Sequence, residues 1–288
     1  MVSRVLQLSL DYELLDSGEG RKLERFGSKI ISRPSSLCIW KRLGGPWKKS
    51  NADYLPGKGW VFRCKPFAEW EVRVTAELCV KARLQRNGQV GMFPEHIQYL
   101  PHVMHALVDC KEDPPQVLNL FASSGLASLI CLAVGAQVTH VDKSKQALEW
   151  ADVNFRMNGL GGRARMIAED AVRFLQREVR RSRKYDVVIA DPPNFSRLSR
   201  TQTWQLDQVV LDLVTALSAV LSPSGRLFLT CHQSYGFAET VANLLYRPGQ
   251  GENTGLVCES LTIKEAQTPR RIPVGVLLYG SLPSCPSP

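Results

Sequence analysis

The stretch QVLNLFASSGLASLICLAVGAQVTHVD, residues 116–142, decides the fold. A short apolar run ends at the small polar turn 122–125, and an apolar segment of helical length follows it through Val134. A second apolar run, 138–141, ends in Asp142. This pattern predicts strand, tight turn, helix and strand. It places an acidic side chain about 20 residues beyond the first turn, as in nucleotide-binding βαβ units.

The ligand of such a unit is held at both ends. The N–H groups of the turn and the helix N-terminus hold a polar or anionic group, and the acid accepts hydrogen bonds from ribose hydroxyls. The turn has one glycine, Gly125, where a dinucleotide fingerprint has three. A ligand with a ribose and no phosphate therefore fits better, and a nicotinamide-dependent oxidoreductase is disfavoured. A βαβ unit that only packs remains the alternative.

The composition bounds the class of protein. A chain of 288 residues accommodates one large α/β domain and a smaller module. Its eight cysteines include no CxxC pair and no histidine at ligand spacing, which argues against a zinc site and a disulfide framework and favours a reducing cytoplasm. No apolar run approaches the roughly 20 residues of a membrane span, and the first ten residues do not resemble a secretory signal.

The charge of the chain indicates a polyanionic partner. The formal net charge is +9, and residues 163–184 alone hold eight basic residues against three acidic ones. RNA is the obvious candidate, and the basic segment is either an RNA-facing surface or a solvated helix face. The alternative is that the chain is merely basic.

Residues 1–100 differ in character from the rest and are expected to form a basic, Trp-rich, β-rich module. Four of the six tryptophans lie between Trp40 and Trp70, interleaved with lysines and arginines. Such rings can stack on bases or can form the core of a small β module, and the sequence favours neither role. We expect a strand over 70–84, a turn at Asn87-Gly88, and a helix from Pro94 to about Val108. Residues 101–115 then complete the helix and link to a domain over 116–288.

The alternation of strand and helix continues beyond the central unit and predicts a doubly wound, mostly parallel, seven-stranded α/β sheet. Ser144 is expected to cap a helix that ends at Asn158-Gly159. After the next strand, a helix should turn Val172, Leu175 and Val179 inward. The remaining expected elements are strands over 164–168, 185–190, 227–231, 256–263 and 274–282, helices over 206–221 and 236–246, a turn over 222–225, and a loose tail over 283–288.

Acidic residues follow three of the predicted parallel strands. Asp142, Asp170 and Asp191 stand where ligands collect in open parallel sheets, although each could be an ordinary helix cap. Asp191 also opens the sequence DPPNF, in which two prolines stiffen the chain and remove N–H donors where a strand ends. Such a loop exposes a carboxylate and carbonyl acceptors, and Phe195 can lie against a planar base. These groups suit a flipped purine or pyrimidine.

The motifs together resemble a family. VLNLFASSGLA (117–127), HVDKSKQALEWADVNFRMNGL (140–160), the EDA at Glu169 and DPPNFS (191–196) look like class I S-adenosylmethionine-dependent methyltransferases. The resemblance is greatest to the bacterial 23S ribosomal RNA group that includes the guanine-N7 and 5-methylcytosine enzymes. It covers Gly91 to about Phe237.

The resemblance implies the fold of that family, a Rossmann-like methyltransferase domain, and S-adenosylmethionine as cofactor, with no metal. It further implies a role for each matched position. The residues implied in cofactor binding are Phe93 in a segment that closes over the cofactor, Asn119, Phe121, Ser123 and Gly125 around the methionine, Asp142 at the ribose, Lys143 beside the adenine, Asp170 and Ala171 at the adenine, and Asp191. The residues implied in presenting the target base are Asp191, Pro192, Asn194 and Phe195.

The chemistry of the target atom distinguishes guanine-N7 methylation from cytosine-C5 methylation. Guanine N7 has a lone pair and needs only positioning, whereas cytosine C5 requires a cysteine that first adds covalently. Cys231 lies about two residues before the position of that cysteine in the relatives, where Gln233 stands here. We therefore expect Cys231 to be a strand residue. His232 could orient a substrate phosphate or be a bystander.

The sequence thus predicts an enzyme that methylates a guanine nitrogen of large-subunit ribosomal RNA. Cytosine-C5 methylation through Cys231 and a non-catalytic RNA-binding protein remain the alternatives. The target nucleotide and the oligomeric state stay open.

Overall fold

The structure, a computed structural model, describes residues 5–43, 45–197, 203–232, 235–245 and 255–281. The chain divides into two compact units. The large unit comprises residues 98–261 and 275–288 with the first six residues, and the small unit comprises 7–97 and 262–274.

The large unit is built on a seven-stranded sheet with the strand order β10-β9-β8-β11-β14-β16-β15. The first five strands of this order run parallel, and β16 runs antiparallel to β14. The predicted fold class is confirmed. Because the strand order reverses between β8 and β11, the carboxyl ends of these two strands flank the topological switch point. The strands are β8 (Gln116–Leu120), β9 (Gln137–Asp142), β10 (Ala164–Ala168), β11 (Tyr185–Ala190), β14 (Leu221–Cys231), β15 (Leu256–Lys264) and β16 (Arg271–Ser281).

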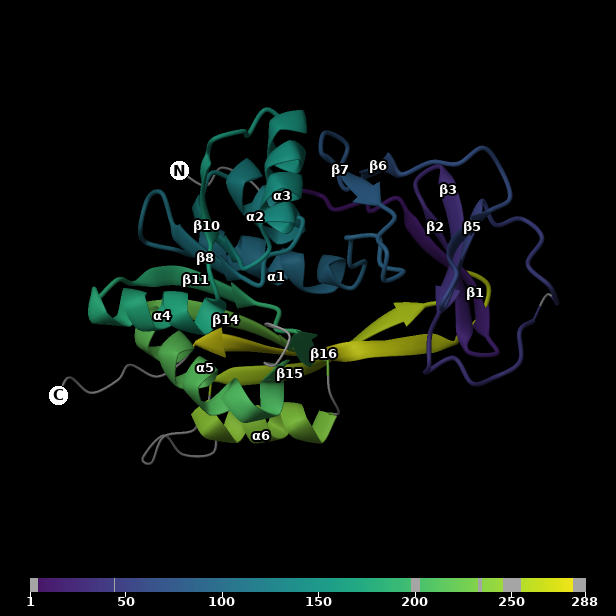
Figure 1. Ribbon diagram of the computed structural model, residues 1–288. Helices are drawn as coiled ribbons and strands as arrows, with labels where there is room; N and C mark the ends of the chain where they lie inside the picture. Colours follow the sequence, from purple (N-terminus) through teal and green to yellow (C-terminus); the bar gives the residue numbers. More distant parts are fainter. Residues whose placement is uncertain (1–4, 44, 198–202, 233–234, 246–254, 282–288) are drawn as a thin grey trace. The chain divides into compact units, whose positions relative to one another are not determined.

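Helices cover both faces of this sheet (Figure 1). On one face lie α1 (His96–Val108), α2 (Leu126–Ala133) and α3 (Lys145–Met157), and on the other lie α4 (Ala171–Arg180), α5 (Leu206–Val220) and α6 (Tyr235–Leu245). Leu118 and Val188 of the sheet pack in one core with Phe174 and Leu217 of the second group, and all four are fully buried. Each such side chain contributes about 1.5–3 kcal/mol of burial free energy.

The predicted helix ends of the large unit are confirmed where a cap defines them. The Oγ of Ser144 accepts a hydrogen bond from the backbone N–H of Ala147 at 3.2 Å. Asn158 ends α3, and Gly159 follows it with φ of +70°. Asp170 caps α4. Side chains that satisfy free N–H groups fix where each helix begins.

Three local expectations are wrong. Val179 is 38% exposed, because Phe174 and Glu178 take the inward positions of α4. Residues 222–225 belong to β14, which shifts its register against β11 between Tyr185 and Val187. The predicted strand over 70–84 is a hairpin of β6 (Glu69–Arg73) and β7 (Cys79–Arg83).

The turn between β6 and β7 has a local cause. The Oγ1 of Thr75 accepts hydrogen bonds from the N–H groups of Glu77 at 3.1 Å and Leu78 at 2.9 Å. A hydroxyl that bonds to the next backbone groups favours a turn over a continuing strand. The expected turn at Asn87-Gly88 is present after β7, where the N–H of Gly88 donates to the carbonyl of Gln85 at 3.0 Å.

The small unit is β-rich. Its main sheet has the order β1-β2-β3-β4-β5. The tip of the β15–β16 hairpin also belongs to it, because Ile263 and Ile272 pack with Leu14 and Cys38 in one buried cluster. The strands are β1 (Tyr12–Gly18), β2 (Arg21–Phe26), β3 (Lys29–Pro34), β4 (Ala52–Leu55) and β5 (Gly59–Phe62).

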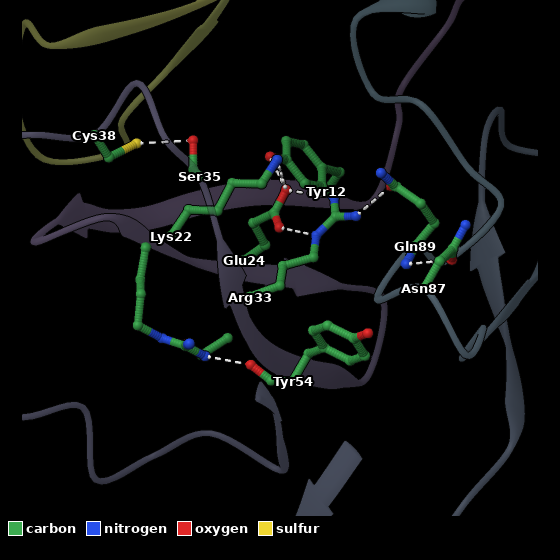
Figure 2. Close-up of polar contacts among 11 residues, drawn as sticks. Tyr12, Lys22, Glu24, Arg33, Ser35, Cys38, Tyr54, Asn87 and Gln89 are labelled. Atoms are coloured by element: carbon green, nitrogen blue, oxygen red, sulfur yellow. Dashed lines mark hydrogen bonds and ion pairs between the residues drawn. The ribbon is translucent and has the colours of Figure 1, made fainter. Parts of the chain in front are cut away.

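A buried ionic cluster lies inside the small unit (Figure 2). The Glu24 carboxylate, which is 0% exposed, accepts hydrogen bonds from Arg33 Nη2 at 3.0 Å and from the Tyr12 hydroxyl at 2.9 Å. Lys22 Nζ lies 3.0 Å from the same carboxylate. Burial acts to raise the pKa of Glu24, but Arg33 and Lys22 outweigh it and lower this pKa to about 2.

Candidate cofactor and substrate site

The carboxyl ends of the five parallel strands form one edge of the large sheet. Asp142, at the end of β9, stands in register with Ala168, the last residue of β10, and Asp170 follows two residues later. Ala190, the last residue of β11, is in register with Leu120 of β8, and Asp191 follows it. The structure therefore brings all three predicted acids to the same edge, on both sides of the switch point.

The turn after β8 has an unusual backbone. Phe121, Ser123 and Gly125 have φ of +55°, +50° and +86°. At Gly125 a Cβ would lie 2.9 Å from the ring of Phe155, so both the conformation and the packing require glycine. The left-handed backbone costs about 1–2 kcal/mol at a non-glycine residue, so Phe121 and Ser123 hold this conformation at a cost. Such a turn at a strand end is typical of a ligand-binding loop.

The Asp142 carboxylate joins the turn to the end of β9. Its Oδ2 accepts from the N–H of Ser123 at 2.9 Å, and its Oδ1 accepts from the N–H of Ser144 at 2.8 Å. A carboxylate has about four lone-pair sites, so each oxygen keeps the capacity for another hydrogen bond. These free acceptor positions fit the two hydroxyl donors of a ribose diol, and Lys143 beside Asp142 is exposed.

A buried polar chain lies beneath the turn, and sequence reasoning missed it. Asn119, which is 3% exposed, donates from Nδ2 to the Oγ of Ser128 at 2.9 Å, and this Oγ lies 2.9 Å from His140 Nδ1. Burial lowers the pKa of His140 to about 4. Asn154 of α3 donates to the carbonyl of Ser124 at 2.8 Å. These bonds tie the turn to β8, β9, α2 and α3.

Asp170 has a defined structural role at the same edge. Its Oδ1 accepts from the N–H groups of Val172 at 3.1 Å and Arg173 at 3.2 Å. The cap thus uses one of the two carboxylate oxygens. Ala171 beside it is buried.

The loop that follows β11 is fixed to the end of β14. The Thr230 hydroxyl donates to Oδ1 of Asp191, and His232 Nε2 lies 2.6 Å from the same oxygen. The Nδ2 of Asn194 donates to the backbone carbonyl of His232 at 2.9 Å. Pro192 is buried and Asn194 is exposed. These bonds hold the Asp-Pro-Pro-Asn segment against the end of β14.

Phe195 is described by its backbone alone. It opens the short strand β12 (Phe195–Arg197), which pairs with β13 (Thr203–Gln205). Its side chain lies outside the described part of the chain.

Cys231 has the properties of a strand residue. It is 1% exposed and pairs with Val276 of β16. Burial, with smaller effects of Cys258 and Asp191, raises the pKa of its thiol to about 12. A thiol in this state is a poor nucleophile at neutral pH. Gln233, which stands where the relatives carry their cysteine, lies outside the described residues.

Phe93 belongs to the small unit, unlike the other predicted cofactor residues. Its ring stacks on His96, with 5.4 Å between ring centroids and 25° between ring planes.

The tryptophans of the small unit use their N–H groups within that unit. Trp40 donates to the Ser17 carbonyl at 3.0 Å and Trp47 to Asp16 Oδ2 at 2.7 Å. Trp60 and Trp70 donate to the carbonyls of Gln85 and Phe26, each at 2.7 Å. Trp70 is buried and the other three are half-buried, and indoles that find partners within their own module favour a packing role over base stacking.

Within the described residues, no three His, Cys, Asp or Glu side chains gather where they could hold a metal ion. Nor does any helix in that part of the chain combine the length and apolarity needed to cross a membrane.

The comparison with known families agrees with the geometry of this edge. The sequence profile of the S-adenosylmethionine-dependent methyltransferases matches residues 50–240. The chain belongs to this family, and S-adenosylmethionine is its cofactor.

Individual relatives agree with the family. A SAM-dependent methyltransferase from Agrobacterium tumefaciens has 31% sequence identity and a TM-score of 0.85, over 96% of this chain and 92% of that one. A structure assigned as a methyltransferase and complexed with SAH is 14% identical with a TM-score of 0.69, over 94% of this chain and 76% of that one, and shows the fold alone.

A ribosomal RNA large subunit methyltransferase K/L from Shewanella frigidimarina is 32% identical over 162 residues. The match covers 54% of this chain and 22% of the relative, so the chain spans about a fifth of that protein's length.

Proposed function

We propose that the chain transfers a methyl group from S-adenosylmethionine to a base nitrogen of structured RNA, most specifically a guanine nitrogen of large-subunit ribosomal RNA. The observation that carries the proposal is the Asp191–Asn194 segment, which Thr230 and His232 fix at the same sheet edge as Asp142. A restrained carboxylate beside a cofactor site can accept an N–H of a base and orient it.

The cofactor-binding residues follow the same edge. In the proposal, the methionine end is held by the end of β8 at Asn119 and by the backbone of the following turn, which is left-handed at Phe121, Ser123 and Gly125. Asp142 accepts from the ribose hydroxyls and Lys143 lies beside the adenine. Asp170 accepts from the adenine amino group with the oxygen not used in its cap, and Ala171 lines the ring.

The bound cofactor supplies a sulfonium methyl that is already activated for transfer. The protein's own residues then need only to position the base and exclude water. Asp191 and Asn194 would orient the base, while Pro192 stiffens the loop and Phe195 would support the ring. The high pKa of Cys231 favours a nitrogen with a free lone pair over cytosine C5, because the C5 route needs a thiolate.

RNA as the substrate is supported by charge and by relatives. The formal net charge is +9, and the Shewanella relatives are named as ribosomal RNA methyltransferases. In the proposal the domain of residues 116–288 performs the transfer, the segment 101–115 links it, and the module of residues 1–100 supports binding of the RNA. Ribosomal RNA as substrate makes the cytoplasm the proposed compartment.

Methyl transfer to RNA tests this proposal directly. The full chain is incubated with radiolabelled S-adenosylmethionine and total RNA from cells that lack the protein. We expect label in large-subunit RNA with the wild type and a loss of at least 100-fold with Asp191→Ala. Salt-sensitive RNA binding without any transfer would identify a non-catalytic RNA-binding protein instead.

Cytosine-C5 methylation is tested by one further variant. Cys231→Ser should retain full activity if the acceptor is a nitrogen. An inactive but folded Cys231→Ser protein that still binds the cofactor would support the C5 route.

A further inference from the structure

A pocket lies at the edge of the large sheet opposite the cofactor edge, where the parallel strands begin. Its volume is about 570 Å³, and every residue that lines it belongs to the large unit. Gln116, Gln137 and Tyr185 are the first residues of β8, β9 and β11, and Arg165 is the second residue of β10. The pocket, called here the amino-edge pocket, is therefore separated from the cofactor edge by the full length of the strands.

The lining of this pocket is cationic. Arg163, Arg165, Arg183 and Lys184 all contribute to it, and no carboxylate does. Arg163 and Arg183 are exposed, and neither guanidinium forms an ion pair with a carboxylate in the described ranges. Lys184 donates to the carbonyl of Ala219 at 2.8 Å, which directs its ammonium without neutralising it.

Two buried carboxylates, Asp186 and Glu178, fix the pocket wall from outside the lining, and Asp186 Oδ2 accepts from the N–H of Gln116 at 2.9 Å. Glu178 is 0% exposed and accepts from the Tyr185 hydroxyl at 2.8 Å. Arg165 lies 3.7 Å from it and Arg181 3.5 Å, so one carboxylate faces more than one arginine. The guanidinium of Arg165 also lies 5.9 Å from the centre of the Phe174 ring. Arg165 is thereby held in place at the mouth of the pocket.

The remaining lining combines the apolar residues Pro114, Ala136 and Val138 with polar side chains at the strand starts. Gln116 Nε2 donates to Gln137 Oε1 at 3.0 Å, which fixes both amides at the strand starts. Thr139 and Tyr185 add hydroxyl groups. Several cations, hydroxyls and amides around a cavity suit a phosphate, because guanidinium groups donate two parallel hydrogen bonds to phosphate oxygens.

We propose that the amino-edge pocket binds phosphodiester groups of the RNA substrate and so anchors the RNA backbone while the target base reaches the carboxyl edge. This inference rests on the proposed function. β8 has five residues and is roughly 17 Å long, so an RNA strand of several nucleotides has to bridge the two edges.

The test uses charge reversal on exposed side chains. The double variant Arg163→Glu and Arg183→Glu is compared with Arg180→Glu and Arg226→Glu, two exposed arginines of the large unit that do not line the pocket. The affinity for the RNA that the wild type methylates, or otherwise for total ribosomal RNA, is measured at several salt concentrations. Cofactor affinity is measured in parallel.

We expect the pocket variant to bind RNA at least 10-fold more weakly and to reduce the slope of log affinity against log salt by about 2, because each lost phosphate contact reduces it by about 1. Cofactor affinity and the maximal rate at saturating RNA should stay unchanged. The control variant should lose less than 3-fold in affinity. An equal loss of RNA affinity in the pocket variant and the control variant would show that only the overall charge of the protein matters, and it would overturn the proposal.

A second arm separates RNA from a free anion. Inorganic phosphate is titrated by calorimetry into the wild type and into the pocket variant. Phosphate binding that disappears in the pocket variant while RNA affinity is unchanged would overturn the proposal in favour of a small-anion site. Because these are binding measurements, they remain readable even if no RNA is methylated, which would refute the proposed function separately.

Discussion

His232 Nε2 lies 2.6 Å from Asp191 Oδ1, and this contact joins the end of β14 to the loop after β11. Asp191 Oδ1 also accepts from Thr230, so one carboxylate oxygen is held from two positions of the neighbouring strand. Two restraints on one oxygen leave the Asp191 carboxylate little freedom to turn. We propose that His232 acts as a positioning residue for the Asp191 carboxylate.

Replacing His232 by alanine should slow methyl transfer without weakening cofactor binding. Loss of a hydrogen bond to a charged group costs about 1.5–3 kcal/mol, which corresponds to roughly 10- to 150-fold in the maximal rate. His232→Gln, which can still donate, should recover part of the rate. Steady-state kinetics check this, and an unchanged rate in a folded His232→Ala protein would remove the positioning role.

Asp142→Ala should weaken the binding of S-adenosylmethionine by roughly 10- to 150-fold, because it removes charge-assisted hydrogen bonds at the ribose and at the Ser123 turn. Calorimetric titration of the cofactor measures this. Asp152→Asn, on the neighbouring helix α3, is the matched control and should bind normally. If Asp142→Ala binds S-adenosylmethionine as tightly as the wild type does, the cofactor does not bind at this edge of the sheet.

Gly125→Ala should destabilise the turn more than Gly162→Ala does. Both glycines have positive φ, but an added Cβ meets the Phe155 ring at 2.9 Å only at Gly125, whereas Gly162 has open space. The left-handed backbone costs about 1–2 kcal/mol at either site. The clash adds to this cost only in Gly125→Ala, and that variant should also bind the cofactor more weakly. Urea unfolding of both variants measures the difference in stability. An equal loss of unfolding free energy in the two variants would show that packing against Phe155 is unimportant.

The small unit should lose stability in acid through Glu24. Its pKa of about 2 in the folded protein lies below the ordinary value of 4.5. The resulting stabilisation is complete above pH 4.5 and is lost as the pH falls through the interval from 4.5 to 2. Tryptophan fluorescence reports this unit during urea unfolding, because four tryptophans lie in it.

Glu24→Gln should therefore destabilise the small unit at pH 7 by about 3–5 kcal/mol, since it leaves Arg33 buried without its partner. Its stability should also vary less than that of the wild type between pH 4.5 and 2. Glu71→Gln, at an exposed position, is the control. The same acid dependence in wild type and Glu24→Gln would assign it to other groups.

The elements that local sequence could predict are those fixed by nearby residues. Ser144 and Asp170 indicate where helices begin, because their side-chain oxygens accept hydrogen bonds from backbone N–H groups two or three residues away. The acids at the carboxyl edge were predictable because parallel strands end at the same edge of a sheet.

The features that sequence could not predict depend on contacts between distant segments. Three such features join segments that are far apart in the sequence and share no repeating pattern. They are the contact of Ser128 with His140, the pocket at the amino edge, and the packing of Ile263 and Ile272 on Leu14. The hairpin turn at Thr75 was missed because alternating apolar residues continue through it. Its signal, a hydroxyl able to bond to the following N–H groups, is weak in sequence alone.

The most direct test of the central claim is the identity of the methylated nucleoside. Large-subunit RNA from cells lacking the protein is treated with wild type or Asp191→Ala, digested to nucleosides and analysed by mass spectrometry. We expect a guanosine methylated at nitrogen with the wild type and none with the variant. A 5-methylcytidine product, or no methylated nucleoside from any RNA, would contradict it.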